Sequence, residues 1–276
     1  MRTSINYTAI TPNLELEKAF STDYHVDHIK GAVRSNTKTE YHPVSVNEIQ
    51  EPEKFQLDVH GFCVLHGKTH LDPLNAYKNK SEVEKAYCVY NIITVTSKVR
   101  KRDIDYPEVV RAYRTEYEQP SSIAHCDWST AGALTVLRWC FPGNENFWKG
   151  KRFDLLNVWR PLKQPSDDWP LAVCDYTTVD PEHDIRLNDA IRRDRVDELC
   201  LLHYNEKHKW YYLKDQGVDD LLVFRNTDSH GDKAREFQIT ALPVHRWIGA
   251  FHAAVRNPLA KGPPRESVEV RLVAIY

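Results

Sequence analysis

Residues 152–175 read RFDLLNVWRPLKQPSDDWPLAVCD, and this stretch holds two short runs of strand-forming residues separated by a turn. Leu, Val and Trp are frequent in both runs, whereas Pro, Ser and Asp are concentrated between them. β-Branched and aromatic residues favour strands, and Pro, Ser and Asp favour turns. The stretch therefore predicts two strands joined by a turn.

Similar runs occur on both sides of this stretch, from about residue 120 to residue 276. They are IAHCDWS (123–129), GALTVLRWCF (132–141), KWYYL (209–213), DLLVFRNTDS (220–229) and ESVEVRLVAIY (266–276). One insert, LNDAIRRDRVDEL (187–199), is predicted to be helical. Many short strands at fairly regular spacing indicate a sandwich or a barrel. The expected fold class is mainly β with flanking helices.

The first hundred residues show a weaker pattern. Residues 1–55 are polar, and we expect an irregular arm that packs over the main domain. Further predicted elements are strands at 56–66 and 92–102 and helices at 73–90 and 105–117. No linker is evident, so we expect one domain over 1–276, with an N-terminal extension (1–104) and a β core (105–276).

Composition excludes several classes of protein. The chain has 276 residues, 41% of them hydrophobic, and a formal net charge of −2, which disfavours a nucleic-acid binder. No apolar run approaches the ~18 residues of a membrane span, and the first residues lack the apolar core of a signal peptide. We therefore expect a cytoplasmic protein with a small-molecule substrate and no nucleic-acid or membrane partner. The oligomeric state stays open, with a homodimer as one option.

The triplet His125-Cys126-Asp127 is the sharpest chemical signal. Residues i and i+2 of a strand point to the same face, so the imidazole and the carboxylate can bind one metal ion. A second histidine from a distant strand would complete a 2-His-1-carboxylate triad, which holds Fe(II) and leaves positions open for a co-substrate and O2. His252, 125 residues after the aspartate (252 − 127), is the candidate for this third ligand, with His245 and His230 as competitors.

A second signal is PRESVEVR, residues 264–271. Alternation places Arg265, Ser267, Glu269 and Arg271 on one face of a strand, opposite a row of aliphatic residues. Charged groups on the inner face of a barrel strand are costly unless they are paired, and a bound dicarboxylate would pair them. A guanidinium matches a carboxylate with two hydrogen bonds, and a neighbouring hydroxyl can add a third.

The chain resembles the fungal hydroxylase/desaturase family of Fe(II)- and 2-oxoglutarate-dependent oxygenases, which is found in secondary-metabolite clusters. The resemblance covers about residues 105–276 and depends on four segments. These are HCDWS (125–129), NVWRPLKQPSDDWPLAVCD (157–175), KWYYLKDQGVDDLLVFRNTDS (209–229), and HAAVRNP with PPRESVEVR (252–271).

The resemblance implies a double-stranded β-helix (a cupin-like jelly roll) that oxidises a C–H bond of a small molecule, by hydroxylation, desaturation or ring formation. It implies Fe(II) held by His125, Asp127 and His252, with O2 and 2-oxoglutarate as co-substrates. The distal carboxylate of 2-oxoglutarate would bind Arg265 with Ser267, and Arg271 is the second choice.

Weaker candidates follow from the same segments. Asn157 is a candidate donor to the co-substrate, and Trp159, Tyr212 and Arg225 are candidates for the substrate pocket. The sequence departs from the family after the distal ligand, where it has His252-Ala253-Ala254-Val255. Two alternatives stay open: a metal-dependent hydrolase that uses the same HxD…H ligands, and a catalytically inactive ligand-binding barrel.

Overall fold

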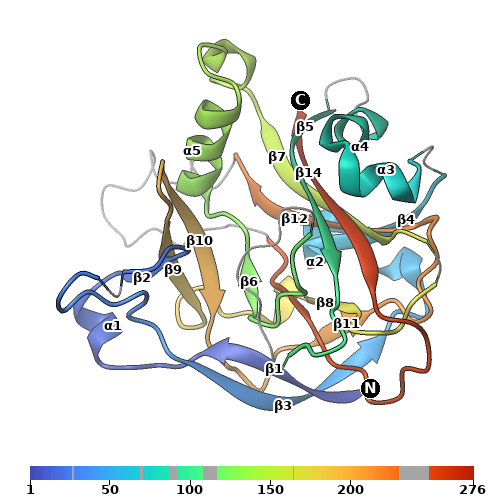
Figure 1. Cartoon of the computed structure of the whole chain (residues 1–276), viewed down its shortest axis with the longest axis horizontal. Coiled ribbons are helices and arrows are strands. Elements are labelled where there is room, and N and C mark those ends of the chain that lie inside the picture. Colours follow the sequence, from blue (N-terminus) through green and yellow to red (C-terminus); the bar gives the residue numbers. More distant parts are fainter. Residues whose placement is uncertain (27, 69–70, 88–91, 108–116, 164, 230–248) are drawn as a thin grey trace.

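Two β-sheets make up most of the structure (Figure 1). The computed structural model describes residues 1–26, 28–68, 71–87, 92–107, 117–163, 165–229 and 249–276. Within these ranges the helices are short and lie around the two sheets (Figure 1). The prediction of a mainly β fold with flanking helices is confirmed.

The larger sheet has nine strands and carries residues from both ends of the chain. In spatial order its strands are β1 (Arg2–Thr8), β3 (Thr39–Glu48), β11 (Trp210–Tyr212), β8 (Leu171–Cys174), β13 (His252–Ala254), β6 (His125–Cys126), β10 (Val196–Leu202), β9 (Ile185–Ile191) and β2 (Ala19–Thr22). The predicted irregular arm at 1–55 therefore contributes three strands. Because these strands pair with strands of the predicted core, we propose that extension and core form one domain.

The smaller sheet has five antiparallel strands. In spatial order these are β4 (Phe62–His66), β12 (Asp220–Asp228), β7 (Phe153–Pro161), β14 (Glu266–Ile275) and β5 (Ile92–Lys101). From β11 to β14 the chain alternates between the two sheets. In the nine-stranded sheet β13 pairs with β6, although the two strands are more than a hundred residues apart in the sequence.

The helices are α1 (Asn13–Leu16), α2 (Leu57–His60), α3 (Pro73–Lys78), α4 (Lys80–Ala86) and α5 (Thr130–Cys140), with 3-10 turns η1 (Pro52–Lys54), η2 (Glu145–Phe147) and η3 (Tyr176–Thr178). Among the described residues, none of these helices has the length and apolar character needed to cross a membrane.

Helix α5 occupies a segment that was predicted to be a strand, GALTVLRWCF, so that prediction is wrong. Its buried apolar residues Ala133, Val136 and Leu137 are spaced by three and one, which is the pattern of a helix face and not of strand alternation. Ser129 caps the helix, since its side chain accepts a hydrogen bond from the backbone N–H of Gly132 at 3.0 Å. Helix spacing and a cap therefore prevail over the strand propensity of the individual residues.

The helix predicted at 187–199 is also wrong, because this segment forms the antiparallel hairpin β9–β10. The backbone N–H of Arg192 donates to the carbonyl of Arg195 at 2.8 Å and closes the turn. Asp197 accepts hydrogen bonds from the Nε atoms of both arginines, at 3.0 and 2.8 Å. Pairing of β10 with β6 is a tertiary contact, and such contacts override local propensity.

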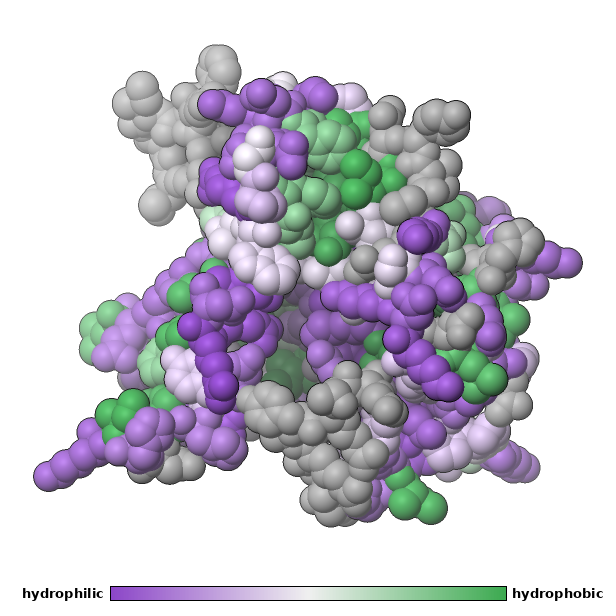
Figure 2. Space-filling view, turned by 45° about the horizontal axis from the view of Figure 1, so that its top comes forward, coloured by the Kyte–Doolittle hydropathy of each residue, from purple (hydrophilic) through white to green (hydrophobic). Residues whose placement is uncertain are grey.

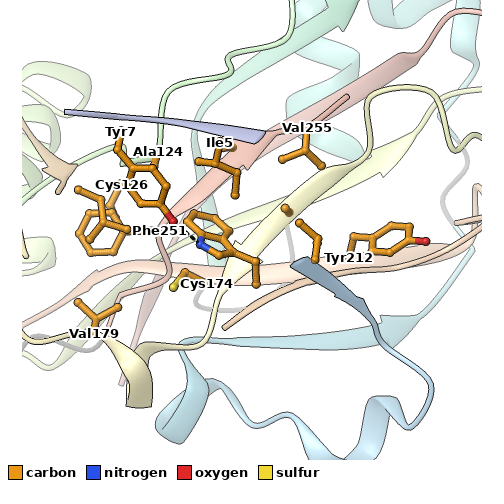
Figure 3. Close-up of a cluster of buried hydrophobic side chains, with 14 of the residues drawn as sticks. Ile5, Tyr7, Ala124, Cys126, Cys174, Val179, Tyr212, Phe251 and Val255 are labelled. Atoms are coloured by element: carbon orange, nitrogen blue, oxygen red, sulfur yellow. Dashed lines mark hydrogen bonds between the residues drawn. The ribbon is translucent and has the colours of Figure 1, made fainter. Parts of the chain in front are cut away.

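Behind the paired strands β6 and β13 lies a buried cluster that fixes their positions (Figure 3). Cys126 and Phe251 belong to it, together with Tyr7 of β1, whose hydroxyl accepts a hydrogen bond from Trp210 Nε1 at 2.7 Å (Figure 3). Because strand side chains alternate, the neighbours of Cys126, which are His125 and Asp127, point to the opposite face of the sheet.

Gly132 is expected to be essential for the packing of α5 on β10. A methyl group at this position would lie 2.0 Å from the backbone oxygen of Glu198, a distance that requires the helix to move. Gly132→Ala should lower the free energy of unfolding by about 3 kcal/mol through overpacking. Urea unfolding measures this loss. Gly262→Ala is the control, because nothing lies within 4 Å of its added methyl group, and equal stability of the two variants would contradict the prediction.

Candidate iron site

His125, Asp127 and His252 meet on the inner face of the nine-stranded sheet. His252 of β13 is paired directly with His125 of β6, and the two rings lie 4.4 Å apart. Asp127 follows β6, with Oδ1 3.8 Å from His125 Nε2. One ligand atom from each of the three residues lies within 4.8 Å of the others, so together they can hold one metal ion.

Backbone carbonyls orient the two imidazoles. His125 Nδ1 donates to the carbonyl of Ile123 at 2.7 Å, and His252 Nδ1 donates to that of Ala250 at 3.3 Å. A carbonyl only accepts, so Nδ1 carries the proton in each ring and Nε2 keeps its lone pair for a metal. This is the usual second contact of a histidine that binds metal.

Electrostatics keep the three groups in their metal-binding protonation states. Burial lowers the pKa of both His125 and His252 to about 4, with the neighbouring imidazole adding to the effect at His125. Burial alone would raise the pKa of Asp127, but the charge of Arg271 and the two histidines bring it below its usual range. Two neutral imidazoles and one carboxylate are the donor set of a non-haem Fe(II) site.

Asp127 is held by a network that the sequence did not reveal. Arg271 Nε donates to Oδ2 at 2.9 Å, and its Nη2 donates to Oδ1 at 2.7 Å. Asn157 Nδ2 donates to Oδ2 at 2.7 Å, and Asn157 Oδ1 in turn accepts from Asn226 Nδ2 at 2.6 Å. These contacts fix the carboxylate before any metal binds.

Asn157 was predicted to donate to the co-substrate. Both polar atoms of its side-chain amide instead form hydrogen bonds with protein groups, Nδ2 with Asp127 and Oδ1 with Asn226, and the residue is fully buried. We infer that it positions the iron ligand, while a direct bond to 2-oxoglutarate stays a prediction. No sequence pattern marked Asn226, because an asparagine in a strand carries no spacing signal of its own.

Replacing Asn157 by alanine should weaken Fe(II) binding about 10- to 100-fold, as loss of an outer-shell partner of a ligand typically does. Mn(II), which is stable in air, can stand in for iron in a calorimetric titration. Asn144→Ala, at an exposed position, is the matched control. Unchanged affinity in Asn157→Ala would show that this hydrogen bond does not support the metal ligand.

Arg265 and Ser267 form the pair that the strand pattern predicted. Arg265 Nε donates to Ser267 Oγ at 3.0 Å, and Nη1 donates to the carbonyl of Trp169 at 2.7 Å. The guanidinium lies 4.9 Å from the centre of the Trp159 ring, whose buried Nε1 has no hydrogen-bond partner. No carboxylate among the described residues forms an ion pair with Arg265.

The two candidate arginines therefore differ in their partners. Arg271 forms ion pairs with Asp127 and Glu269, both at 2.7 Å, which raise its pKa although burial alone would lower it. The guanidinium of Arg265 donates only to neutral acceptors, although the backbone N–H of this residue donates to Asp168 Oδ2 at 2.8 Å. Burial lowers the pKa of Arg265 to about 9. A buried cation without a counter-ion favours an anionic ligand.

The remaining site residues are placed in the protein core. Trp159 is buried beneath Arg265, as described above. Tyr212 belongs to the buried cluster on the opposite face of the sheet. Arg225 forms ion pairs with Asp58 at 2.5 Å and Asp154 at 3.1 Å. None of the three is among the residues that line the cleft at the triad, and a substrate-pocket role for Trp159, Tyr212 and Arg225 stays a prediction.

A cleft of about 790 Å³ opens beside the triad, and His125, Asp127 and Arg271 lie in its wall. Its wall includes hydroxyl groups from β1, β2, β3 and β5 and also Lys98, which pairs with Glu118 at 3.0 Å. Figure 2 shows a face that is hollowed near its centre, with hydrophilic residues on both sides of the hollow. The sequence did not predict this lining, because most of its hydroxyl groups come from the N-terminal extension, which holds none of the predicted site residues.

The two competing distal ligands, His230 and His245, lie outside the described residues. Also outside them is most of the helix predicted at 105–117. The described residues thus contain a complete triad without either histidine.

The metal-free protein should lose stability as the pH falls from about 6.5 to about 4. Because the folded-state pKa of His125 and His252 is lowered to about 4, the unfolded chain binds more protons in this range. Stability is then fully present above the unfolded pKa of about 6.5 and decreases toward the folded pKa. Urea unfolding at several pH values measures the slope, which should be smaller in His252→Asn than in the parent. An identical slope would contradict neutral burial of His252.

Comparison with known proteins places these residues in context. The model of a family described as Oxidoreductase/YMDC permease-like domain matches residues 5–275. One relative is the Fe(II)/2-oxoglutarate-dependent dioxygenase nvfI of Aspergillus novofumigatus, 26% identical, with 90% of this chain and 88% of the relative aligned. Another is the hydroxylase/desaturase efuI of Hormonema carpetanum, 24% identical over 92% and 91% of the two chains. The resemblance to fungal oxygenases predicted from the sequence is confirmed.

A solved structure, the iron and alpha-ketoglutarate-dependent endoperoxidase NvfI, superimposes with a TM-score of 0.75 at 22% identity. The match covers 100% of this chain and 97% of that one. This likeness confirms the predicted double-stranded β-helix fold.

Proposed function

This chain belongs to the Oxidoreductase/YMDC permease-like domain family, and from that premise we propose that it is an Fe(II)- and 2-oxoglutarate-dependent oxygenase. Its relatives include a dioxygenase of that type and two enzymes named for hydroxylation or desaturation. The substrate would be a small molecule of secondary metabolism. When bound, Fe(II) and 2-oxoglutarate supply the oxidation of a C–H bond by O2.

The main support for the proposal is that the two sheets carry both a candidate metal site and a buried cation that could bind a carboxylate. His125, Asp127 and His252 present a facial set of two nitrogens and one carboxylate, which fits Fe(II). Arg265 supplies a buried cation with no ion-pair partner among the described residues, which fits the distal carboxylate of 2-oxoglutarate. A metal-dependent hydrolase would need the triad alone.

Each residue of the candidate site has a defined role in this proposal. The two imidazoles and Asp127 would bind the metal, and Asn157 and Arg271 would hold the carboxylate in place. Arg265, with Ser267 and the free Nε1 of Trp159 nearby, would orient the co-substrate. The cleft beside the triad would hold the substrate, so that position decides which C–H bond reacts.

The test is spectroscopic. Metal-free protein receives Fe(II) and then 2-oxoglutarate without oxygen, and a weak visible charge-transfer band is expected from bidentate binding of the 2-oxoacid. Iron-loaded, folded protein that shows no band would overturn the proposal and favour the hydrolase or the inactive binding barrel. Cytoplasmic location and the absence of nucleic-acid and membrane partners stay predictions, and the oligomeric state stays open, with a homodimer as one option.

A further inference from the structure

Among the described residues, three buried polar atoms in the wall of the cleft have no hydrogen-bond partner, and one of them, Thr96 Oγ1, lies on β5 of the five-stranded sheet. The other two, on the nine-stranded sheet, are Thr8 Oγ1 and Asn188 Oδ1, and each of these residues is only 1% exposed. Both residues line the same cleft as His125 and Asp127. Buried polar atoms are nearly always paired, so two unpaired atoms in one cleft indicate a ligand that pairs them.

The strand register places Asn188 at a useful distance from the triad. His125 pairs with Leu201 of β10, and Leu199, two residues earlier on the same face, pairs with Asn188 of β9. His125 and Asn188 are thus separated by two strand spacings across the sheet and by two residues along the strand. With spacings of about 4.8 Å and about 3.4 Å, their Cα atoms lie roughly 12 Å apart.

Thr8 approaches the cleft from the N-terminal strand. Asn6, two residues before it on β1, forms a parallel bridge with Ile123, two residues before His125. The carbonyl of Thr8 accepts a hydrogen bond from His203 Nδ1 at 2.8 Å, which fixes its backbone. The Thr8 side chain therefore lies beside the strand that carries the first iron ligand.

The chemistry of this end of the cleft selects the ligand group. Asn188 Nδ2 donates to Ser21 Oγ at 3.2 Å, so Oδ1 is left as an acceptor that needs an O–H or N–H donor. The Thr8 hydroxyl can donate or accept. Two of the six basic residues in the same wall, Arg192 and Arg195 of the β9–β10 hairpin, form ion pairs with Asp197. These features fit a neutral hydroxyl group better than a carboxylate.

We propose that Thr8 and Asn188 form a substrate-binding subsite for a neutral hydroxyl group, so that the substrate is an oxygenated small molecule reaching from this subsite toward the metal. The subsite is inferred from the unpaired side-chain atoms of Thr8 and Asn188. Only its link to the oxidised carbon rests on the proposed oxygenase function.

Benzyl alcohol and benzyl methyl ether are suitable probes, because the ether keeps the oxygen and loses the donor hydrogen. Their dissociation constants are measured by ligand-observed NMR on the full chain loaded with Zn(II) and 2-oxoglutarate. The alcohol should bind about 3- to 10-fold more tightly than the ether, the effect of one net hydrogen bond. The preference should disappear in Thr8→Val and persist in Thr8→Ser.

Two further measurements separate a ligand role from a structural one. Thr8→Val should leave the melting temperature equal or higher, because the native hydroxyl has no partner to lose. With Mn(II) in place of Zn(II), relaxation of the alcohol's ring protons should place them within about 15 Å of the metal, as the strand spacing requires.

Equal constants for the two probes, absence of binding by either, or a preference that survives in Thr8→Val would overturn the subsite. The titration is repeated on metal-free protein. A preference for the alcohol in protein that binds neither metal nor 2-oxoglutarate would support the subsite and overturn the oxygenase proposal, so the two failures are distinguishable.

Discussion

Asp127→Ala is expected to abolish the charge-transfer band of the Fe(II)·2-oxoglutarate complex and to weaken Fe(II) binding by at least about 100-fold. Asp127 is the only carboxylate in the triad, and outer-shell changes alone typically cost 10- to 100-fold. Mn(II) calorimetry measures the affinity, and the anaerobic visible spectrum measures the complex.

The substitution also leaves Arg271 with one ion-pair partner in place of two. Removing one partner of a buried pair typically destabilises a protein by about 3–5 kcal/mol, so the variant's folding must be checked by circular dichroism. Asp127→Asn keeps the shape of the side chain and removes its charge, and it should lose the band as well.

Asp197→Asn is the matched control, because this acid lines the same cleft but pairs with Arg192 and Arg195. It should bind metal like the parent. A folded Asp127→Ala protein that retains both the band and the affinity would show that iron is held by other residues.

The sequence predicted the parts of the site that follow from strand periodicity. His125 and Asp127 are separated by one residue, and Arg265 and Ser267 likewise, so alternation alone places each pair on one face. The structure adds that Val268, Val270 and Leu272 pack together in one core cluster, as the same alternation predicted.

Contacts between distant strands could not be predicted in this way. Asn157, Asn226 and Arg271 converge on Asp127 from β7, β12 and β14, and nothing in their local spacing indicates that they meet. The same limit explains the hairpin β9–β10, which was predicted to be a helix. Its charged residues satisfy local helix propensity, and only pairing with β6 makes it a strand.

The choice between the two arginines required three-dimensional information for the same reason. Arg271 lies on β14 and Arg265 directly precedes this strand, and the sequence gives no basis for deciding which arginine has a carboxylate partner. The structure pairs the Arg271 guanidinium with two acids, whereas the Arg265 guanidinium donates to neutral acceptors. This difference leads to a prediction about the co-substrate.

Arg265→Gln is expected to raise the dissociation constant of 2-oxoglutarate about 100-fold while Fe(II) affinity stays close to that of the parent. Two charge-assisted hydrogen bonds to the distal carboxylate are worth about 3 kcal/mol, which corresponds to roughly that factor. Arg265→Lys keeps the charge but not the fork, and it should show a smaller increase. Titration of the anaerobic charge-transfer band gives the constants.

Arg271→Gln is the counterpart experiment, because it removes the guanidinium on β14 that holds the Asp127 carboxylate. It should reduce Fe(II) affinity more than 2-oxoglutarate affinity, the reverse of the Arg265 variants. 2-Oxobutyrate lacks the distal carboxylate, so the parent should prefer 2-oxoglutarate strongly and Arg265→Gln should prefer it only weakly. If Arg271→Gln instead lost this preference while Arg265→Gln kept it, the roles of the two arginines would be exchanged, and the ion pair of Arg271 with Asp127 would have to open when the co-substrate binds.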